Sequence, residues 1–152
     1  MKGLIQRVSQ ASVTVDGEEI ASINAGLLLL LGVEKHDGEG ETKELCRKIL
    51  NYRVFPDDAG RMNCSLLDIG GDLLVVPQFT LAADTSSGAR PGFSLAAAPD
   101  VAKKLYGSFL ADARLQLGVG KVKEGRFGAD MKVGLVNEGP ATFMLESRLK
   151  GG

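Results

Sequence analysis

One short segment limits the fold of this chain more than any other, because residues 26–33 (GLLLLLGV) carry no polar side chain. A strand with one wet face alternates apolar and polar residues, whereas an unbroken apolar run is typical of a strand covered on both faces. A helix across a bilayer needs about 20 such residues, so this run is far too short to be one. It predicts the central strand of a sheet in a soluble domain.

The chain around this run is rich in further strand signals. Residues 2–9 alternate in polarity, and residues 11–15 are mostly β-branched. The Asp16-Gly17 pair then predicts a tight turn into a returning strand at 18–23. The opening is therefore interpreted as a meander, and the order of the candidates mostly favours antiparallel pairing. Later strand candidates lie at 65–69, 72–81, 119–124, 131–136 and 141–146.

Two segments have helical periodicity instead. Residues 42–53 place Leu45, Ile49 and Tyr52 on one face, and a second helix starts at Pro99. The apolar face of this second helix is predicted to hold Val101, Leu105, Phe109 and Ala113. Between the last strand candidate before it and this helix, residues 82–98 are irregular; a loop of that length is usually functional or disordered.

The composition argues against one class of function, non-specific nucleic-acid binding. The chain has 152 residues, one domain's worth, and 18 Lys and Arg against 19 Asp and Glu. A non-specific nucleic-acid binder normally carries a basic excess, so this balance leaves room only for a local RNA-contacting patch. Arg47, Lys48 and Arg53 on the first helix are candidates, although they fit a solvated helix face better. The first residues lack a signal peptide, which predicts a cytoplasmic protein without a membrane anchor.

The chain has few histidines and cysteines, the residues that most often act as bases, nucleophiles or metal ligands. His36 is the single histidine, which removes most zinc chemistry and most Ser-His or Cys-His catalysis. We interpret it as a surface residue. Cys46 and Cys64 have no CxxC spacing and are expected to be free, inert thiols. An enzyme with this composition must work without a conventional general base.

Two stretches carry more than a structural pattern. In residues 77–81 (PQFTL), Pro77 ends an apolar strand because its nitrogen cannot join the ladder, so the next residues can turn backbone N–H groups towards a ligand. In residues 137–142 (NEGPAT), Gly139-Pro140 predicts a turn between two strands. A cis bond at this pair would point two carbonyls the same way.

With these two stretches, the chain resembles the D-aminoacyl-tRNA deacylase family, also called the D-tyrosyl-tRNA deacylase family. The similarity covers about 140 residues in order, which is highly specific for a motif comparison. The segments that carry it are 5–8 (IQRV), 11–15 (ASVTV), 26–34 (GLLLLLGVE), 74–85 (LVVPQFTLAADT), 90–91 (RP), 125–131 (GRFGADM) and 135–143 (LVNEGPATF).

The resemblance implies an α+β fold and a carboxylic ester hydrolase. We expect a single domain at 1–147 with a short tail at 148–152, a mostly antiparallel, curled, barrel-like sheet with two main helices, and a homodimer. The expected substrate is D-aminoacyl-tRNA, together with mischarged glycyl-tRNA, cleaved at the ester to the 3′-terminal adenosine. No metal and no cofactor is expected.

The resemblance also assigns residues. Gln78, Phe79 and Thr80 are expected at the catalytic site, and Gly139 and Pro140 are expected to enter the partner's site and reject L-amino acids by steric clash. Further pocket residues are expected to be Pro77, Asn137, Phe127 and Met131. Backbone N–H groups near Phe79 and Thr80 would hold the oxyanion. The Thr80 hydroxyl is interpreted as a positioning group rather than a nucleophile, with the ribose 2′-hydroxyl assisting water.

Two departures from the family pattern keep alternatives open. Pro77 stands where the family has Ser, and Ala141 stands where it has Val. A related subgroup with relaxed chirality also begins this motif with Pro-Gln, so one alternative is a deacylase of mischarged L-aminoacyl-tRNA. Others are a non-catalytic RNA-binding dimer and an interaction module that uses loop 82–98. Retention of Phe79 favours strict D-selectivity.

Overall fold

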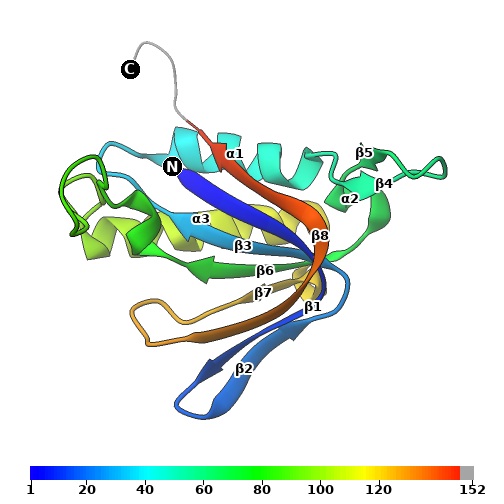
Figure 1. The fold of residues 1–152 in the computed structure, drawn as a ribbon, viewed down its shortest axis with the longest axis horizontal. Coiled ribbons are helices and arrows are strands. Elements are labelled where there is room, and N and C mark those ends of the chain that lie inside the picture. Colours follow the sequence, from blue (N-terminus) through cyan, green and yellow to red (C-terminus); the bar gives the residue numbers. More distant parts are fainter. Residues whose placement is uncertain (148–152) are drawn as a thin grey trace.

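A computed structural model describes residues 1–147 as one six-stranded sheet with a small two-stranded sheet beside it (Figure 1). The strands are β1 (Lys2–Val15), β2 (Glu18–Ile23), β3 (Gly26–Gly32), β4 (Phe55–Pro56), β5 (Met62–Cys64), β6 (Asp72–Pro77), β7 (Val122–Glu124) and β8 (Lys132–Glu146). The helices are α1 (Glu39–Asn51), α2 (Leu66–Ile69) and α3 (Pro99–Leu117), with 3₁₀ turns η1 (Phe79–Ala82) and η2 (Val119–Lys121). The tail expected at 148–152 lies outside the described residues.

β1 pairs with three other strands, and this makes the sheet curl. Its first half pairs with β3, its second half pairs with β2, and β8 runs antiparallel to both halves. A long strand that changes partners in this way must bend, as Figure 1 shows for β1 and β8. The expected single α+β domain with a curled, barrel-like sheet is confirmed.

The sheet is mixed rather than antiparallel throughout. β3 pairs parallel with β6, and β6 pairs parallel with β7. The order of these elements explains both pairs, because α1 lies between β3 and β6 in the chain and α3 lies between β6 and β7. Such helical crossovers bring the next strand back in the same direction. All three parallel strands therefore end at the same edge of the sheet.

Several strands have different bounds in the structure from those expected. The meander of residues 2–9 and 11–15 is one continuous strand, β1, and residues 131–136 and 141–146 both belong to β8. Only the second half of 119–124 is a strand, because η2 comes first. Of 72–81, only Asp72–Pro77 is extended, because the chain turns into η1 after the proline.

The strand expected at 65–69 is wrong, because this segment is the short helix α2. The Ser65 hydroxyl accepts a hydrogen bond from the Asp68 N–H (3.1 Å), and the Asp68 carboxylate accepts one from the Ser65 N–H (2.8 Å). This reciprocal capping box starts the helix, and Gly70 in the left-handed conformation (φ 61°) ends it. The domain thus has a third, minor helix beside the two main ones.

Apolar residues cover both faces of β3, as its sequence predicts. Leu27 and Leu29 pack in the core that the sheet forms with α1 and α3, whereas Leu28 packs in a second core inside the curl. The second core also holds Val13, Ile23 and Leu74. No helix among residues 1–147 is both long and apolar enough to cross a membrane.

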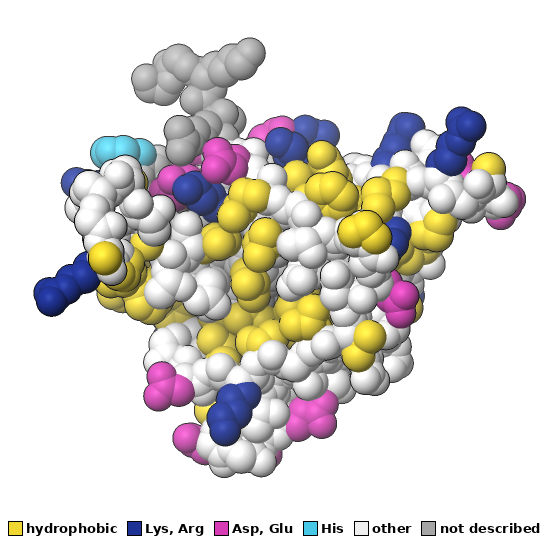
Figure 2. Space-filling view, in the orientation of Figure 1, with side chains coloured by type: hydrophobic (Ala, Val, Ile, Leu, Met, Phe, Trp, Pro, Cys, Tyr) yellow, Lys and Arg dark blue, Asp and Glu magenta, His cyan; other side chains and the backbone are white. Residues whose placement is uncertain are grey.

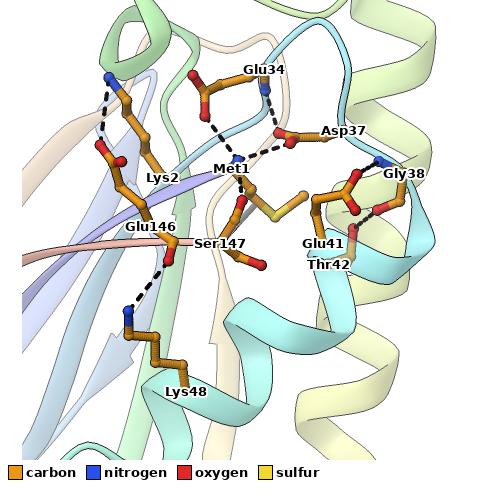
Figure 3. A network of polar contacts seen from close by, with 10 residues as sticks. All are labelled: Met1, Lys2, Glu34, Asp37, Gly38, Glu41, Thr42, Lys48, Glu146 and Ser147. Carbon is orange, nitrogen blue, oxygen red and sulfur yellow. Dashed lines mark hydrogen bonds and ion pairs between the residues drawn. The ribbon is translucent and has the colours of Figure 1, made fainter. Parts of the chain in front are cut away.

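The amino terminus is buried in a polar network (Figure 3). The Met1 ammonium donates to Glu34 Oε1 (2.9 Å), Asp37 Oδ1 (2.8 Å) and the Ser147 carbonyl (3.0 Å). The side chains of Met1, Glu34 and Asp37 are 0%, 16% and 6% exposed. The network joins the start of β1 to the loop before α1 and to the end of β8.

Candidate active site

A cavity of about 280 Å³ opens where the parallel strands β3, β6 and β7 end. The strand ends and the segments after them form its floor, and the first turns of α3 form its cover. Its lining contains no carboxylate, imidazole or amine. The lining residues are Leu31, Val33, Pro77, Gln78, Phe79, Ala97, Pro99, Ala102, Tyr106, Phe127 and Gly128.

Close packing places η1 against the end of β3. The Gln78 N–H donates to the Leu31 carbonyl at 2.8 Å. At Gly32, a Cβ atom would lie 2.9 Å from Leu81 Cβ and 3.2 Å from the Gln78 carbonyl oxygen, so only glycine allows η1 to approach this closely. Pro77 is the last residue of β6 and pairs in register with Leu31. The turn after the proline is therefore fixed by backbone contacts.

Gln78, Phe79 and Thr80 form the rim of the cavity. Gln78 and Phe79 line it, and Thr80 stands exposed beside it. Gln78 Nε2 donates a hydrogen bond to the Thr80 hydroxyl. The Phe79 ring is 62% exposed and packs against Phe93, with 5.4 Å between the ring centroids. Because they open a 3₁₀ turn, the N–H groups of Phe79 and Thr80 precede its first internal hydrogen bond.

Two aromatic rings close the inner end of the cavity. Phe127 follows β7 and lies 6.2 Å from Tyr106 of α3, measured between ring centroids. The Tyr106 hydroxyl donates to the Val75 carbonyl at 3.0 Å, and burial raises the pKa of this hydroxyl. Tyr106 is therefore a neutral wall of the cavity that anchors α3 to β6.

Sequence reasoning missed the contribution of α3. Pro99, Ala102 and Tyr106 of α3 line the cavity together with Ala97, which precedes the helix, but none was expected there. Leu105, Phe109 and Ala113 are buried as expected, whereas Val101 is 40% exposed, and the buried face is wider than expected because it also includes Ala102 and Tyr106. The signal was present, because Ala102 and Tyr106 are four residues apart and share one helix face.

The second expected motif lies elsewhere, in the middle of β8. Gln6 pairs with Thr142 and Val8 pairs with Asn137, so the single residue Arg7 faces residues 138–141, which bulge out of the sheet. The Gly139–Pro140 bond at the tip is cis. The sheet order places β1 and β3 between β8 and β6. The cavity lining includes neither Gly139 nor Pro140.

Arg7 and Asn137 hold this bulge in shape. Arg7 Nε donates to the Glu138 carbonyl (2.9 Å), and its Nη1 donates to the Val54 carbonyl (2.6 Å). Asn137 Nδ2 donates to the carbonyls of Arg7 (2.9 Å) and Ala141 (3.3 Å). Asn137, one of the expected pocket residues, supports the bulge and does not line this cavity.

Other sequence candidates fall at different distances from the cavity. Phe127 lines the cavity, whereas Met131 does not. Met131 packs next to Gly125, close to Pro77: a Cβ atom on Gly125 would lie 2.8 Å from Met131 Sδ and 3.3 Å from Pro77 Cδ. His36 is exposed, and both cysteines are free. Among residues 1–147 there is no cluster of three His, Cys, Asp or Glu side chains that could hold a metal.

The arrangement suits one kind of chemistry. An apolar, aromatic cavity can hold a planar ring, and the adjoining N–H groups can stabilise negative charge on a carbonyl oxygen. A hydroxyl lies within the same rim, but its hydrogen-bond partner is an amide donor rather than a base. Such a site can polarise an activated ester; it has no side chain in the lining that could take a proton.

Comparison with known proteins gives consistent matches. A family model described as D-Tyr-tRNA(Tyr) deacylase matches residues 4–146. A protein of Marinobacter nauticus named D-aminoacyl-tRNA deacylase is 70% identical, over 99% of this chain and 97% of its own length. A protein of Teredinibacter turnerae with the same name is 57% identical, over 97% and 100%.

Two solved structures have a similar fold. A structure titled c-Myc DNA Unwinding Element Binding Protein has a TM-score of 0.94 at 42% identity, over 98% of this chain and 100% of that one. A probable eukaryotic D-amino acid tRNA deacylase has a TM-score of 0.85 at 18% identity, over 95% and 98%. The second match is a likeness of fold alone.

Proposed function

The chain belongs to the D-Tyr-tRNA(Tyr) deacylase family, and we propose that it hydrolyses the ester between a D-amino acid and the 3′-terminal adenosine of tRNA, in the cytoplasm. One observation carries this proposal: Pro77, Gln78 and Phe79, from the motif that resembles the family's, line an apolar cavity, and the N–H groups of Phe79 and Thr80 come before the first hydrogen bond of the turn that forms its rim. An ester of an amino acid is already activated, so a site without a strong base suffices.

We place the adenine ring in the cavity and the ester at its rim. Bases without a pairing partner are commonly bound by stacking on aromatic side chains, and Tyr106 and Phe127 offer such faces. With the base there, the 3′-ester reaches Phe79 and Thr80. Their N–H groups hold the oxyanion, an interaction worth about 2.7–4 kcal/mol per donor in other hydrolases.

Thr80 acts as a positioning group in this proposal. A nucleophilic hydroxyl must give its proton to a base. The Gln78 amide instead donates to the Thr80 oxygen, and among residues 1–147 no ionisable side chain is hydrogen-bonded to this hydroxyl. The attacking group is therefore water, assisted by the neighbouring ribose 2′-hydroxyl of the substrate.

We propose that Gly139 and Pro140 select against L-amino acids in the site of a second copy. One observation supports a homodimer. The bulge with these residues is exposed and absent from the cavity of its own chain. A Cβ atom on Gly139 would lie 2.7 Å from Asn137 Oδ1, so a side chain there would displace the Asn137 amide that supports the bulge. Backbone carbonyls at its tip would face the substrate's α-amino group.

An apolar surface next to the bulge also supports a second copy. Figure 2 shows hydrophobic side chains gathered across the middle of the face that carries β8, with charged side chains mostly around its edge. On β8, Leu135, Val136 and Met144 are 37%, 44% and 46% exposed. Exposed apolar side chains ringed by polar ones are typical of a protein interface.

The test is release of amino acid from D-Tyr-tRNA, L-Tyr-tRNA and Gly-tRNA, with a chelator present. The proposal expects rapid cleavage of the D-ester and the glycyl ester, and little of the L-ester. Comparable cleavage of the L-ester would favour the relaxed-chirality alternative, for which Pro77 is the motivation. Binding of tRNA without any cleavage would favour a non-catalytic RNA-binding dimer.

A further inference from the structure

A second cavity, of about 610 Å³, adjoins the proposed adenosine site. It lies between α3 and the residues of and after β7. Tyr106 and Phe127 line both cavities, so these two rings form a shared wall. The other side chains that matter here are Lys103, Arg114, Glu124 and Arg126. We call this second cavity the basic groove.

The charge of the groove is unlike that of the chain. Three of its lining residues are cations and one is an anion, whereas the whole chain has a formal charge of −1. Arg114 and Glu124 neutralise each other in an ion pair of 2.7 Å. Lys103 and Arg126 are exposed, and within residues 1–147 neither has an ion-pair partner. Two unpaired positive charges therefore remain beside the wall.

We propose that the basic groove binds the backbone phosphates that immediately precede the terminal adenosine of the tRNA, with Lys103 and Arg126 as the contacts. The inference rests on the proposed function, because it starts from an adenine base in the first cavity. From there, the strand must leave past its 5′-phosphate. The groove is the cavity that shares a wall with the adenosine site, and unpaired cations are what phosphates require.

Two other cationic residues, on α1, are less suited to binding these phosphates. Arg47 is paired with Glu44 at 2.6 Å, and Lys48 donates to the Glu146 carbonyl at 3.4 Å. Neither lines either cavity. The patch considered from sequence on α1 is thus separate from the site, and we use it as the matched control.

The experiment compares two substrates and two double variants. The substrates are D-Tyr-tRNA and the D-tyrosyl ester of adenosine, which has no phosphate. The test variant is Lys103→Ala with Arg126→Ala, and the control is Arg47→Ala with Lys48→Ala. We expect the test variant to raise the KM for D-Tyr-tRNA about tenfold or more, the usual effect of losing a charge-assisted contact. The control should leave this KM at the wild-type value.

Two further readouts separate phosphate binding from a structural effect. The loss should be confined to the tRNA substrate, with kcat/KM for the adenosine ester changing no more than in the control. The slope of log KM against log salt should flatten by about 1.4, since each phosphate contact on a single strand contributes about 0.7. The charge-preserving variant Lys103→Arg with Arg126→Lys should restore most of the tRNA affinity.

The outcomes also separate this inference from the proposed function. If the wild-type protein cleaves neither substrate, the proposed function is wrong and the inference falls with it. If it cleaves both, but the test variant keeps the wild-type KM and salt slope, the inference alone is overturned. An equal loss on both substrates also overturns it, because the adenosine ester has no phosphate to contact.

Discussion

The buried amino terminus predicts a large loss of stability when Asp37 loses its charge. In Asp37→Asn, the side chain keeps its size, but the Met1 ammonium loses one of its two carboxylate partners. Removing one partner of a buried pair costs about 3–5 kcal/mol. Glu34 remains as a counter-charge and is partly exposed, so we take the lower end, about 3 kcal/mol. In a domain of this size that lowers Tm by roughly 6–12 °C.

The assay is thermal unfolding followed by circular dichroism, with Asp58→Asn as the matched control. Asp58 is exposed, so the same substitution there should move Tm by less than about 2 °C. A Gly-Ser extension before Met1 should destabilise the protein at least as much as Asp37→Asn, because it replaces the ammonium with a neutral amide at a fully buried position. Equal Tm values for Asp37→Asn and Asp58→Asn would refute the reasoning.

Three further predictions concern the site and the core. Gly32→Ala should push η1 away from β3, at a cost of about 1–3 kcal/mol, and lower kcat/KM for D-Tyr-tRNA more than tenfold, whereas Gly120→Ala, with open space around its Cβ, should change neither. Thr80→Ala should reduce kcat without abolishing it, with Thr85→Ala as the control; complete loss in a folded protein that still binds substrate would identify a nucleophile. Burial raises the pKa of the Cys46 thiol, so at neutral pH a thiol reagent should modify Cys64 quickly and Cys46 only on unfolding; rapid modification of both would contradict the buried position.

Patterns within one element and the hairpin of β1 and β2 were readable from sequence, whereas pairings between elements distant in the chain were not. The apolar run at 26–33 predicted a doubly covered strand, and β3 has apolar cores on both faces. The bulge in β8 was predicted as a break between two strands, because its Gly-Pro pair resembles a turn locally. Only the pairing of Asn137 with Val8 and of Thr142 with Gln6 reveals one strand with a protruding segment.

The helix α2 and the place of Tyr106 in the cavity were missed for different reasons. α2 was within reach, since Ser65 and Asp68 have the spacing of a capping box, but the short apolar segment between them also fits a strand. Tyr106 was not within reach in the same way. Its place in the cavity depends on how α3 crosses the strand ends, which is set by the packing of the whole core.

The site is built from backbone more than from side chains, and this explains what motif reading can and cannot give. The proposed donors are the N–H groups of Phe79 and Thr80, and the proposed gate is a peptide segment at Gly139. Backbone groups are placed by their neighbours: η1 by Gly32 and Leu31, and the bulge by Arg7 and Asn137. Pro77 in place of the family's Ser is compatible with such a site, because the proline still ends β6 and releases the chain into η1. Residue types that merely preserve a turn can therefore decide activity here as strongly as an ionisable side chain does in a conventional hydrolase.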